Sequence, residues 1–216
     1  PMPAIPSGKL VKDGGWLAYD AGTDRLYAAK GNKASDFYSY SPANDSWMVL
    51  GDWPDGIEAK KPGKGAIGCS DGLGVMYAVK GNNTQGFWKY DAAVDSWYQK
   101  RDIPLGVTNK KVKGGTDVVR IEHEGNEYIY LMKGYRNEFY RYDIGTGTWQ
   151  TLGNMPVGAN PKWYKGSFLV GVGHLGAALS QYPGLSQYGL RLVAIFDNDP
   201  ARIGSVVGGF TVLGTE

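Results

Sequence analysis

Four lysines recur along the chain in settings rich in glycine, and their spacing could build a site for anions. Lys12, Lys64, Lys113 and Lys165 follow one another at steps of 52, 49 and 52 residues. If repeated units stack around an axis, equivalent lysines lie on one ring, and a ring facing a central channel would favour an anionic ligand such as a phosphate or a polysaccharide carboxylate. The alternative is that these lysines protect strand edges and remain solvated.

A second set of residues has the spacing of a dinucleotide site. Gly171, Gly173 and Gly176 form a G-x-G-x-x-G turn, and Asp197 follows Gly176 by 21 residues. One such turn is weak evidence in a chain with 33 glycines. Here, however, its context predicts a strand before the turn, a helix after it, and a second strand ending at the acid, which is the arrangement that binds a dinucleotide. The predicted elements are a strand over Ser167–Val170, a helix over Ala177–Tyr182 and a strand over Leu190–Phe196.

Each residue of this second set has a physical role in that arrangement. Gly171 permits a tight turn, Gly173 lets the backbone approach a pyrophosphate, and Gly176 lets the helix pack closely on the strand. Asp197 would accept hydrogen bonds from a ribose and repel a 2′-phosphate, which favours NAD(H) over NADP(H). The alternative is a strand turn without a ligand. Because only the first mononucleotide half is encoded before Glu216, we expect weak NAD(H) binding or none.

The remaining reactive residue types do not assemble a catalytic site, so we expect no enzyme activity. The two histidines are His123, between two glutamates in a predicted hairpin, and His174, at a variable place in the glycine turn. The single cysteine, Cys69, has no C-x-x-C partner and predicts neither a zinc site nor a nucleophile.

An internal repeat of about fifty residues organises most of the chain. A Lys-Gly pair recurs at steps of 50 and 53 residues, followed by an aromatic-x-Tyr segment, then a Trp seven residues after that Tyr and a Pro seven residues after the Trp. Within each copy, short apolar runs alternate with turn residues, which predicts four strands per copy. One such sheet cannot bury both faces alone, so copies must stack. The Trp and Pro residues are Trp47, Trp97, Trp149, Pro54, Pro104 and Pro156.

These motifs resemble kelch repeats over residues 14–166, which implies a β-propeller of four-stranded blades. The resemblance is divergent, because Lys-Gly-Asn or Lys-Gly-Tyr stands where kelch blades usually carry a double glycine. Kelch-like propellers usually close with more than three blades, so we expect a fragment, an open array or completion by another chain. Unpaired sheet edges at its ends would favour self-association. We expect Trp47, Trp97 and Trp149 to occupy equivalent buried places.

Residues 168–210 also resemble the nucleotide-binding domain of the redox-sensing repressor Rex. The matching stretches include LVGVGHLGAAL at residues 169–179 and AIFDNDPARIG at residues 194–204. The resemblance implies NAD(H) binding. The winged-helix domain and the swapped helix of Rex-like proteins are not visible in the sequence, so DNA binding by this chain is not expected.

The composition of the chain excludes several classes of protein. The 216 residues include 28 aromatics and carry a formal charge of +2. This excludes a coiled coil, a collagen-like chain and a strongly basic nucleic-acid surface. No apolar run is long enough to predict a membrane span. We therefore predict a mainly β chain with three domains: an N-terminal segment at 1–13, kelch-like repeats at 14–166 and a partial α/β Rossmann-type unit at 167–216.

Three functions are compatible with this organisation. The first is a non-catalytic binding or structural scaffold whose repeat face binds a protein, a polysaccharide or another anionic ligand. The second is a fragment or fusion of a Rex-like NADH-sensing regulator, which would suit the cytoplasm. The third is an extracellular surface repeat protein whose tail is unrelated to its role.

Overall fold

The computed structural model describes residues 8–157, 162–164, 167–169, 195–197 and 201–214. This part of the chain is mainly β, as the sequence predicts, and contains three antiparallel sheets of four strands, each with its strands in chain order. The first sheet contains β1 (Trp16–Asp20), β2 (Arg25–Ala29), β3 (Phe37–Ser41) and β4 (Ser46–Leu50). The second contains β5 (Ile67–Ser70), β6 (Val75–Val79), β7 (Phe87–Asp91) and β8 (Ser96–Gln99). The third contains β9 (Asp117–His123), β10 (Asn126–Met132), β11 (Phe139–Asp143) and β12 (Thr148–Thr151).

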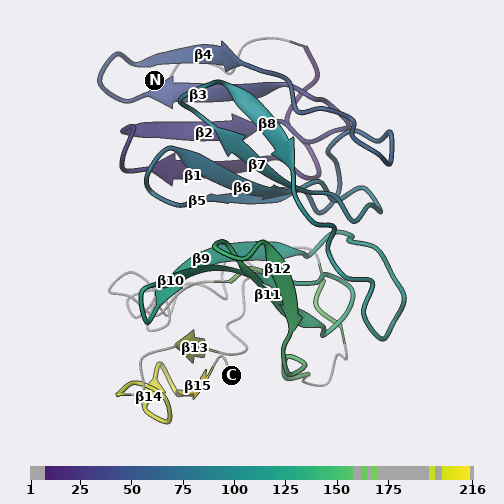
Figure 1. The fold of residues 1–216 in the computed structure, drawn as a ribbon, viewed down its shortest axis with the longest axis vertical. Helices are drawn as coiled ribbons and strands as arrows, with labels where there is room; N and C mark the ends of the chain where they lie inside the picture. Colours follow the sequence, from purple (N-terminus) through teal and green to yellow (C-terminus); the bar gives the residue numbers. More distant parts are fainter. Residues whose placement is uncertain (1–7, 158–161, 165–166, 170–194, 198–200, 215–216) are drawn as a thin grey trace.

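The three sheets form an open stack (Figure 1). The second sheet lies between the first and the third, with β1 packing beside β5 and β5 beside β9. The first strands of the three sheets thus approach one another closely, and side chains of other strands add to the contact. Among the described residues, no helix is long and apolar enough to cross a membrane.

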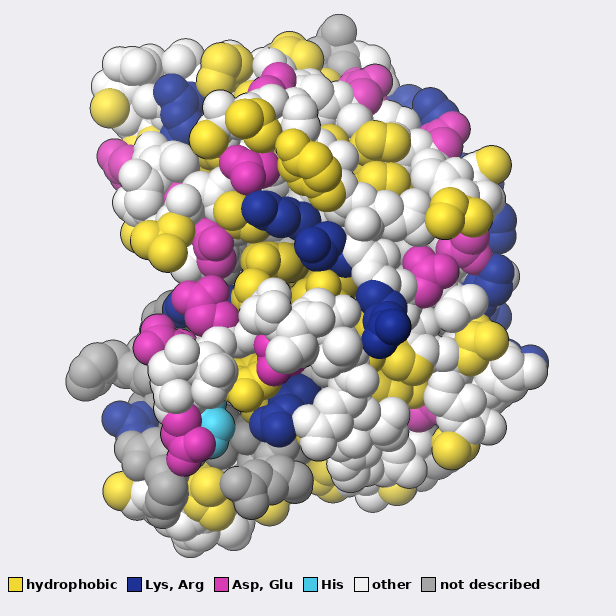
Figure 2. All heavy atoms as spheres, in the orientation of Figure 1, with side chains coloured by type: hydrophobic (Ala, Val, Ile, Leu, Met, Phe, Trp, Pro, Cys, Tyr) yellow, Lys and Arg dark blue, Asp and Glu magenta, His cyan; other side chains and the backbone are white. Residues whose placement is uncertain are grey.

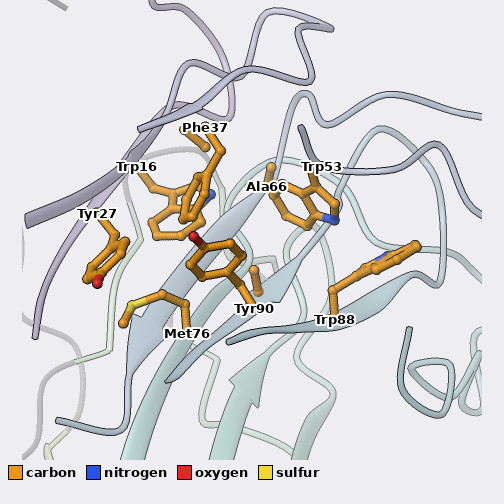
Figure 3. Packing of buried hydrophobic residues seen from close by; sticks show 10 residues of the cluster. Trp16, Tyr27, Phe37, Trp53, Ala66, Met76, Trp88 and Tyr90 are labelled. Carbon is orange, nitrogen blue, oxygen red and sulfur yellow. The ribbon is translucent and has the colours of Figure 1, made fainter. Parts of the chain in front are cut away.

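Aromatic residues from the first two sheets form a shared core. Trp16 and Phe37 belong to one buried cluster with Tyr90 of the second sheet, and Figure 3 shows the Phe37 and Tyr90 rings close together. The rings of Phe37 and Tyr90 lie 4.8 Å apart at 69°, the edge-to-face geometry that aromatic pairs prefer. A similar cluster joins the second and third sheets, where Phe87 packs against Tyr142 at 4.8 Å.

Register explains the recurring spacing of Tyr and Trp. Tyr40 pairs with Trp47, Tyr90 with Trp97 and Tyr142 with Trp149 across the last two strands of each sheet. The rings of each pair are 5.1 Å apart. The predicted equivalence of the three tryptophans is thus confirmed. All three are half-buried, so the expectation that they occupy buried places is wrong.

The described part of the last fifty residues is a small three-stranded sheet. It contains β13 (Ile195–Asp197), β14 (Val206–Val207) and β15 (Phe210–Gly214), in the order β13-β15-β14. β13 confirms the end of the strand predicted over Leu190–Phe196, whereas β14 and β15 were not predicted. The predicted helix and the glycine turn lie outside the described residues.

The strand predicted over Ser167–Val170 is wrong for its first three residues, which have no regular secondary structure. The backbone amide of Leu169 donates to the side-chain carboxylate of Asp117 at 2.6 Å. It does not take part in the backbone pairing of a sheet.

Candidate functional site: a basic pocket between the second and third sheets

A pocket of about 440 Å³ opens where the second and third sheets meet. Lys64 lies just before β5, and Asn82 and Asn83 lie just after β6. Because β5 and β6 are antiparallel, these positions share one end of the sheet. The corresponding end of the third sheet supplies Lys113, before β9, and Tyr135 and Arg136, after β10. The lining residues are Lys64, Asn82, Asn83, Lys113, Tyr135 and Arg136.

The pocket has a positive electrostatic character. Three of its six lining residues are cationic and none is acidic. The ion pairs found within the described part of the chain involve other residues, such as Lys111 with Glu58 at 2.5 Å. Over the molecule as a whole the charges are balanced, and Figure 2 shows basic side chains across one face with acidic groups nearby. The pocket is thus a local concentration of positive charge on an almost neutral molecule.

Arg136 and Tyr135 shape the wall that belongs to the third sheet. Arg136 donates from Nη1 to the carbonyl of Tyr135 at 2.5 Å. Its Nε is buried and makes no hydrogen bond to any described residue, so this guanidinium donor is unsatisfied in the structure. The Lys64 ammonium lies 5.7 Å from the centre of the Tyr135 ring, and Tyr164 packs edge-on against the same ring at 5.2 Å. Tyr135 therefore restrains the lysine through a cation–π contact.

The backbone around the pocket adopts conformations that few residue types tolerate. Asn82, Asn83 and Tyr135 have φ values of 49°, 59° and 61°, in the left-handed region. Asparagine adopts this region more readily than most residues, whereas tyrosine does so at a cost. Hydrogen bonds hold two of these turns, because Asn82 N donates to the Lys64 carbonyl at 3.0 Å and Tyr135 N donates to that of Trp163 at 2.6 Å. The side chains are thus presented from fixed turns.

The two sheets are also joined directly beside the pocket. Asn83 N donates to the Val112 carbonyl, and Val112 N donates to the Thr84 carbonyl, both at 3.0 Å. Val112 is fully buried, so its neighbour Lys113 is fixed relative to the second sheet. Gly65 makes the close approach sterically feasible, since a Cβ there would lie 2.1 Å from the Lys113 carbonyl oxygen. These contacts place the lining residues before any ligand arrives.

The structure brings together two of the four lysines that the sequence singles out. Lys64 and Lys113 line the same pocket, and their side chains are exposed. Lys12 is also exposed but is not among the lining residues, and Lys165 lies outside the described part of the chain. The sequence did not reveal Arg136 or Tyr135, because these positions differ between copies.

A different lysine series, which sequence reasoning missed, is buried. Lys30, Lys80 and Lys133, the lysines of the repeated Lys-Gly pair, are 2%, 1% and 0% exposed. Lys80 donates from Nζ to the carbonyl of Pro54 and, at 2.7 Å, to that of Asp55. Its ammonium also lies 4.6 Å from the centre of the Trp88 ring. Burial lowers the pKa of Lys80 to about 8.

Lys133 makes the equivalent contacts one repeat later. It donates to the carbonyls of Pro104 and Leu105 at 3.0 and 2.8 Å. Its pKa is also lowered by burial, although Glu138, at 3.0 Å, opposes this effect. Lys80 and Lys133 thus fasten the second and third sheets to the linkers that precede them, which is a structural role. The sequence signal that could have revealed this role was the recurrence of the Lys-Gly pair at steps of 50 and 53 residues.

For the dinucleotide set, the structure describes one residue. Asp197 ends β13, and β13 runs parallel to β15 with Asp197 opposite Gly214. Ligands of α/β sheets bind at the carboxyl ends of parallel strands, which is where Asp197 lies. Gly171, Gly173 and Gly176 fall outside the described residues.

The residues that could suggest metal or thiol chemistry are isolated. Within the described ranges, no three His, Cys, Asp or Glu side chains are grouped so that they could hold a metal ion. Cys69 lies on β5, and burial raises the pKa of its thiol. His123 ends β9 at the predicted hairpin.

Comparison with known proteins gives partial matches. No family model matches the chain. The redox-sensing transcriptional repressor Rex of Roseiflexus sp. (strain RS-1) is 36% identical over 84 residues, which is 38% of this chain and 37% of that protein. Rex of Desulfitobacterium hafniense is 51% identical over 45 residues, 21% of each chain. This chain thus spans little more than a third of the curated relatives it matches.

One solved structure, described as "Structure of YjhT", aligns with a TM-score of 0.47 and 18% identity over 70% of this chain and 54% of that one. The sequence matches show that the chain contains a partial Rex-like region.

Proposed function

We propose that this chain is a non-catalytic, kelch-like repeat protein whose stacked sheets are propeller blades and whose basic pocket binds a small anionic ligand. The observation that carries the proposal is the convergence of Lys64, Lys113 and Arg136 on one pocket without an acidic residue in its lining. Cationic groups gathered in a concave site attract anions and are costly to bring together unless an anion is bound there.

The chemistry of the lining favours binding over catalysis. Ammonium, guanidinium, amide and phenol groups all donate hydrogen bonds to an anion and orient it. The pocket volume lies within the range of about 300–1,000 Å³ that is usual for small-molecule sites. The repeat scaffold supplies the rigidity, because the lining residues come from turns held between two packed sheets.

Calorimetric titration of the full chain with inorganic phosphate and with glucuronate, at constant ionic strength, tests the proposal. We expect at least one anion to bind the wild type and to lose at least tenfold in affinity in the Lys64→Gln/Lys113→Gln variant. A matched control is Lys61→Gln/Lys110→Gln, which removes the same charge from exposed lysines outside the pocket. Equal losses in both double variants would show a general charge effect and overturn the proposal.

We propose a second function for residues 167–216, namely a half-site for NAD(H). Its support is the similarity to Rex together with the parallel pairing of β13 and β15, which ends at Asp197. Gly171, Gly173 and Gly176 would approach the pyrophosphate, and Asp197 would bind the adenosine ribose. This makes a Rex-like NADH-sensing fragment the alternative account of the chain.

Fluorescence titration with NADH, and competition by ADP-ribose, tests this half-site. Both ligands should bind weakly and alike, because they share the adenosine half. Asp197→Ala should weaken both, whereas Asp199→Ala, which removes the same charge two residues later, should not. Submicromolar NADH binding with a strong preference over ADP-ribose would contradict a half-site.

A further inference from the structure

We infer that the basic pocket takes a phosphate monoester of a small polyol, such as a sugar phosphate, in preference to a carboxylate. This inference rests on the proposed anion-binding function and names the class of ligand. Three observations support it: the number of cations, the unpaired guanidinium donor, and the polar groups that remain beside them.

The first observation is the number of positive charges. Lys64, Lys113 and Arg136 bring three cations to the pocket, and its lining contains no acid. A carboxylate carries one negative charge, which leaves two cations uncompensated. A phosphate monoester carries about −1.5 to −2 charges at pH 7 and three acceptor oxygens. It therefore matches the charge of the pocket more closely, and its three oxygens can each meet a different cation.

The second observation is the state of Arg136. Its Nη1 is already used by the Tyr135 carbonyl, at 2.5 Å, which fixes the orientation of the guanidinium. The buried Nε has no partner among the described residues. A planar guanidinium with free donors binds phosphate through two parallel hydrogen bonds, which a lysine cannot reproduce. Arg136 is thus the residue that would distinguish a phosphate from other anions by its hydrogen-bonding geometry.

The third observation is the space and polarity left over. Inorganic phosphate would fill only a small part of a pocket of about 440 Å³. Asn82 donates from Nδ2 to the Lys61 carbonyl at 3.0 Å, which holds its amide and leaves the Oδ1 oxygen as an acceptor. The side-chain amide of Asn83 and the side chain of Tyr135 also line the pocket, and the Asn83 backbone amide is already held by the Val112 carbonyl. These groups suit the hydroxyls of a polyol, while the Tyr135 ring offers an apolar wall.

Calorimetric titration of the full chain with four probes tests the inference at constant ionic strength and pH 7.5. The probes are glucose 6-phosphate, glucuronate, inorganic phosphate and glucose. Glucose 6-phosphate should bind at least tenfold more tightly than glucuronate and more tightly than inorganic phosphate, and glucose should bind least. Arg136→Lys keeps the charge but removes the planar donors, so it should reduce affinity for glucose 6-phosphate at least tenfold and for glucuronate much less.

The possible results separate this inference from the function on which it rests. If glucuronate binds as tightly as glucose 6-phosphate, the pocket is an anion site but the phosphate assignment is overturned. If inorganic phosphate equals glucose 6-phosphate, the polyol part is overturned. If none of the anions binds, the proposed function fails as well. The wild-type comparisons decide these points even if Arg136→Lys does not fold, which far-ultraviolet circular dichroism would report.

Discussion

The ammonium group of Lys133 lies 3.0 Å from the carboxylate of Glu138, and both side chains are almost completely buried. The same carboxylate accepts a hydrogen bond from the amide of Thr108 at 2.9 Å. Lys133 also holds the two linker carbonyls of Pro104 and Leu105. One buried pair therefore ties the third sheet to the linker that leads into it.

Removing one member of this pair should destabilise the fold strongly. Lys133→Met leaves the Glu138 charge buried without its partner, and breaking a buried ion pair in this way costs about 3–5 kcal/mol. The double variant Lys133→Met/Glu138→Gln removes both charges and should recover part of that loss. Urea denaturation measures both. A single variant as stable as the wild type would show that the pair has no structural importance.

Lys80 should make stability depend on alkaline pH. Its pKa in the folded chain is about 8, below its usual value of 10.5, because of burial. Between these values the unfolded chain binds more protons than the folded one, so the free energy of unfolding rises with pH. Relative to Lys80→Met, the free energy of unfolding of the wild type should rise by up to roughly 1.4 kcal/mol per pH unit from pH 8 to 10.5. Denaturation curves at pH 7 and pH 9.5 measure this, and an unchanged difference between the two proteins would contradict it.

Gly65 should tolerate no side chain. Its φ is +89°, and a Cβ would lie 2.1 Å from the Lys113 carbonyl oxygen, so Gly65→Ala must separate the second and third sheets. Gly125→Ala is the matched control, since its φ is +74° but no atom lies within 4 Å of the new Cβ. The control should cost about 1–2 kcal/mol of backbone strain. We expect Gly65→Ala to cost at least about 2 kcal/mol more, as judged by thermal denaturation. Similar losses in both variants would mean that the sheets are less tightly apposed.

Asp117 should make the free energy of unfolding fall as pH rises in weak acid, which is opposite in sign to the effect of Lys80. Burial raises its pKa to about 6, although its carboxylate accepts hydrogen bonds from the amides of Val118 and Leu169. The folded chain therefore binds more protons than the unfolded one between pH 4 and 6, and this group lowers stability as pH rises through that range. The difference in unfolding free energy between the wild type and Asp117→Asn, measured at pH 4.5 and pH 7, should shift accordingly. A constant difference would show that Asp117 titrates normally.

The repeat was the most predictable feature of the fold. The spacing of Tyr40 and Trp47, kept in the later copies, reflects one cross-strand register, and a register constrains every copy in the same way. The pocket was only half predictable. Lys64 and Lys113 recur and could be found by spacing, whereas Arg136 is particular to one copy and matters only because the second sheet faces it.

The buried lysines show why the remainder could not be predicted. A lysine in a polar, glycine-rich motif is usually expected to be solvated, because burying an ammonium group is costly. Lys80 is buried because linker carbonyls and the Trp88 ring replace water around it. Those partners lie 8 to 26 residues away in the sequence, and only the folded stack brings them together.

The lysine contacts also affect how this repeat can diversify. Each linker is held at one end by carbonyls that accept from Lys80 or Lys133, and at the other end by the glycine turn that begins the next sheet. In the stretch between these two anchors, exposed residues such as Ile57 and Val107 can change without disturbing a buried contact. Lys64 and Lys113 lie at the boundary of that stretch. The chain therefore separates the residues that preserve its architecture from those that can acquire a new ligand, so recognition can evolve while the stack is maintained.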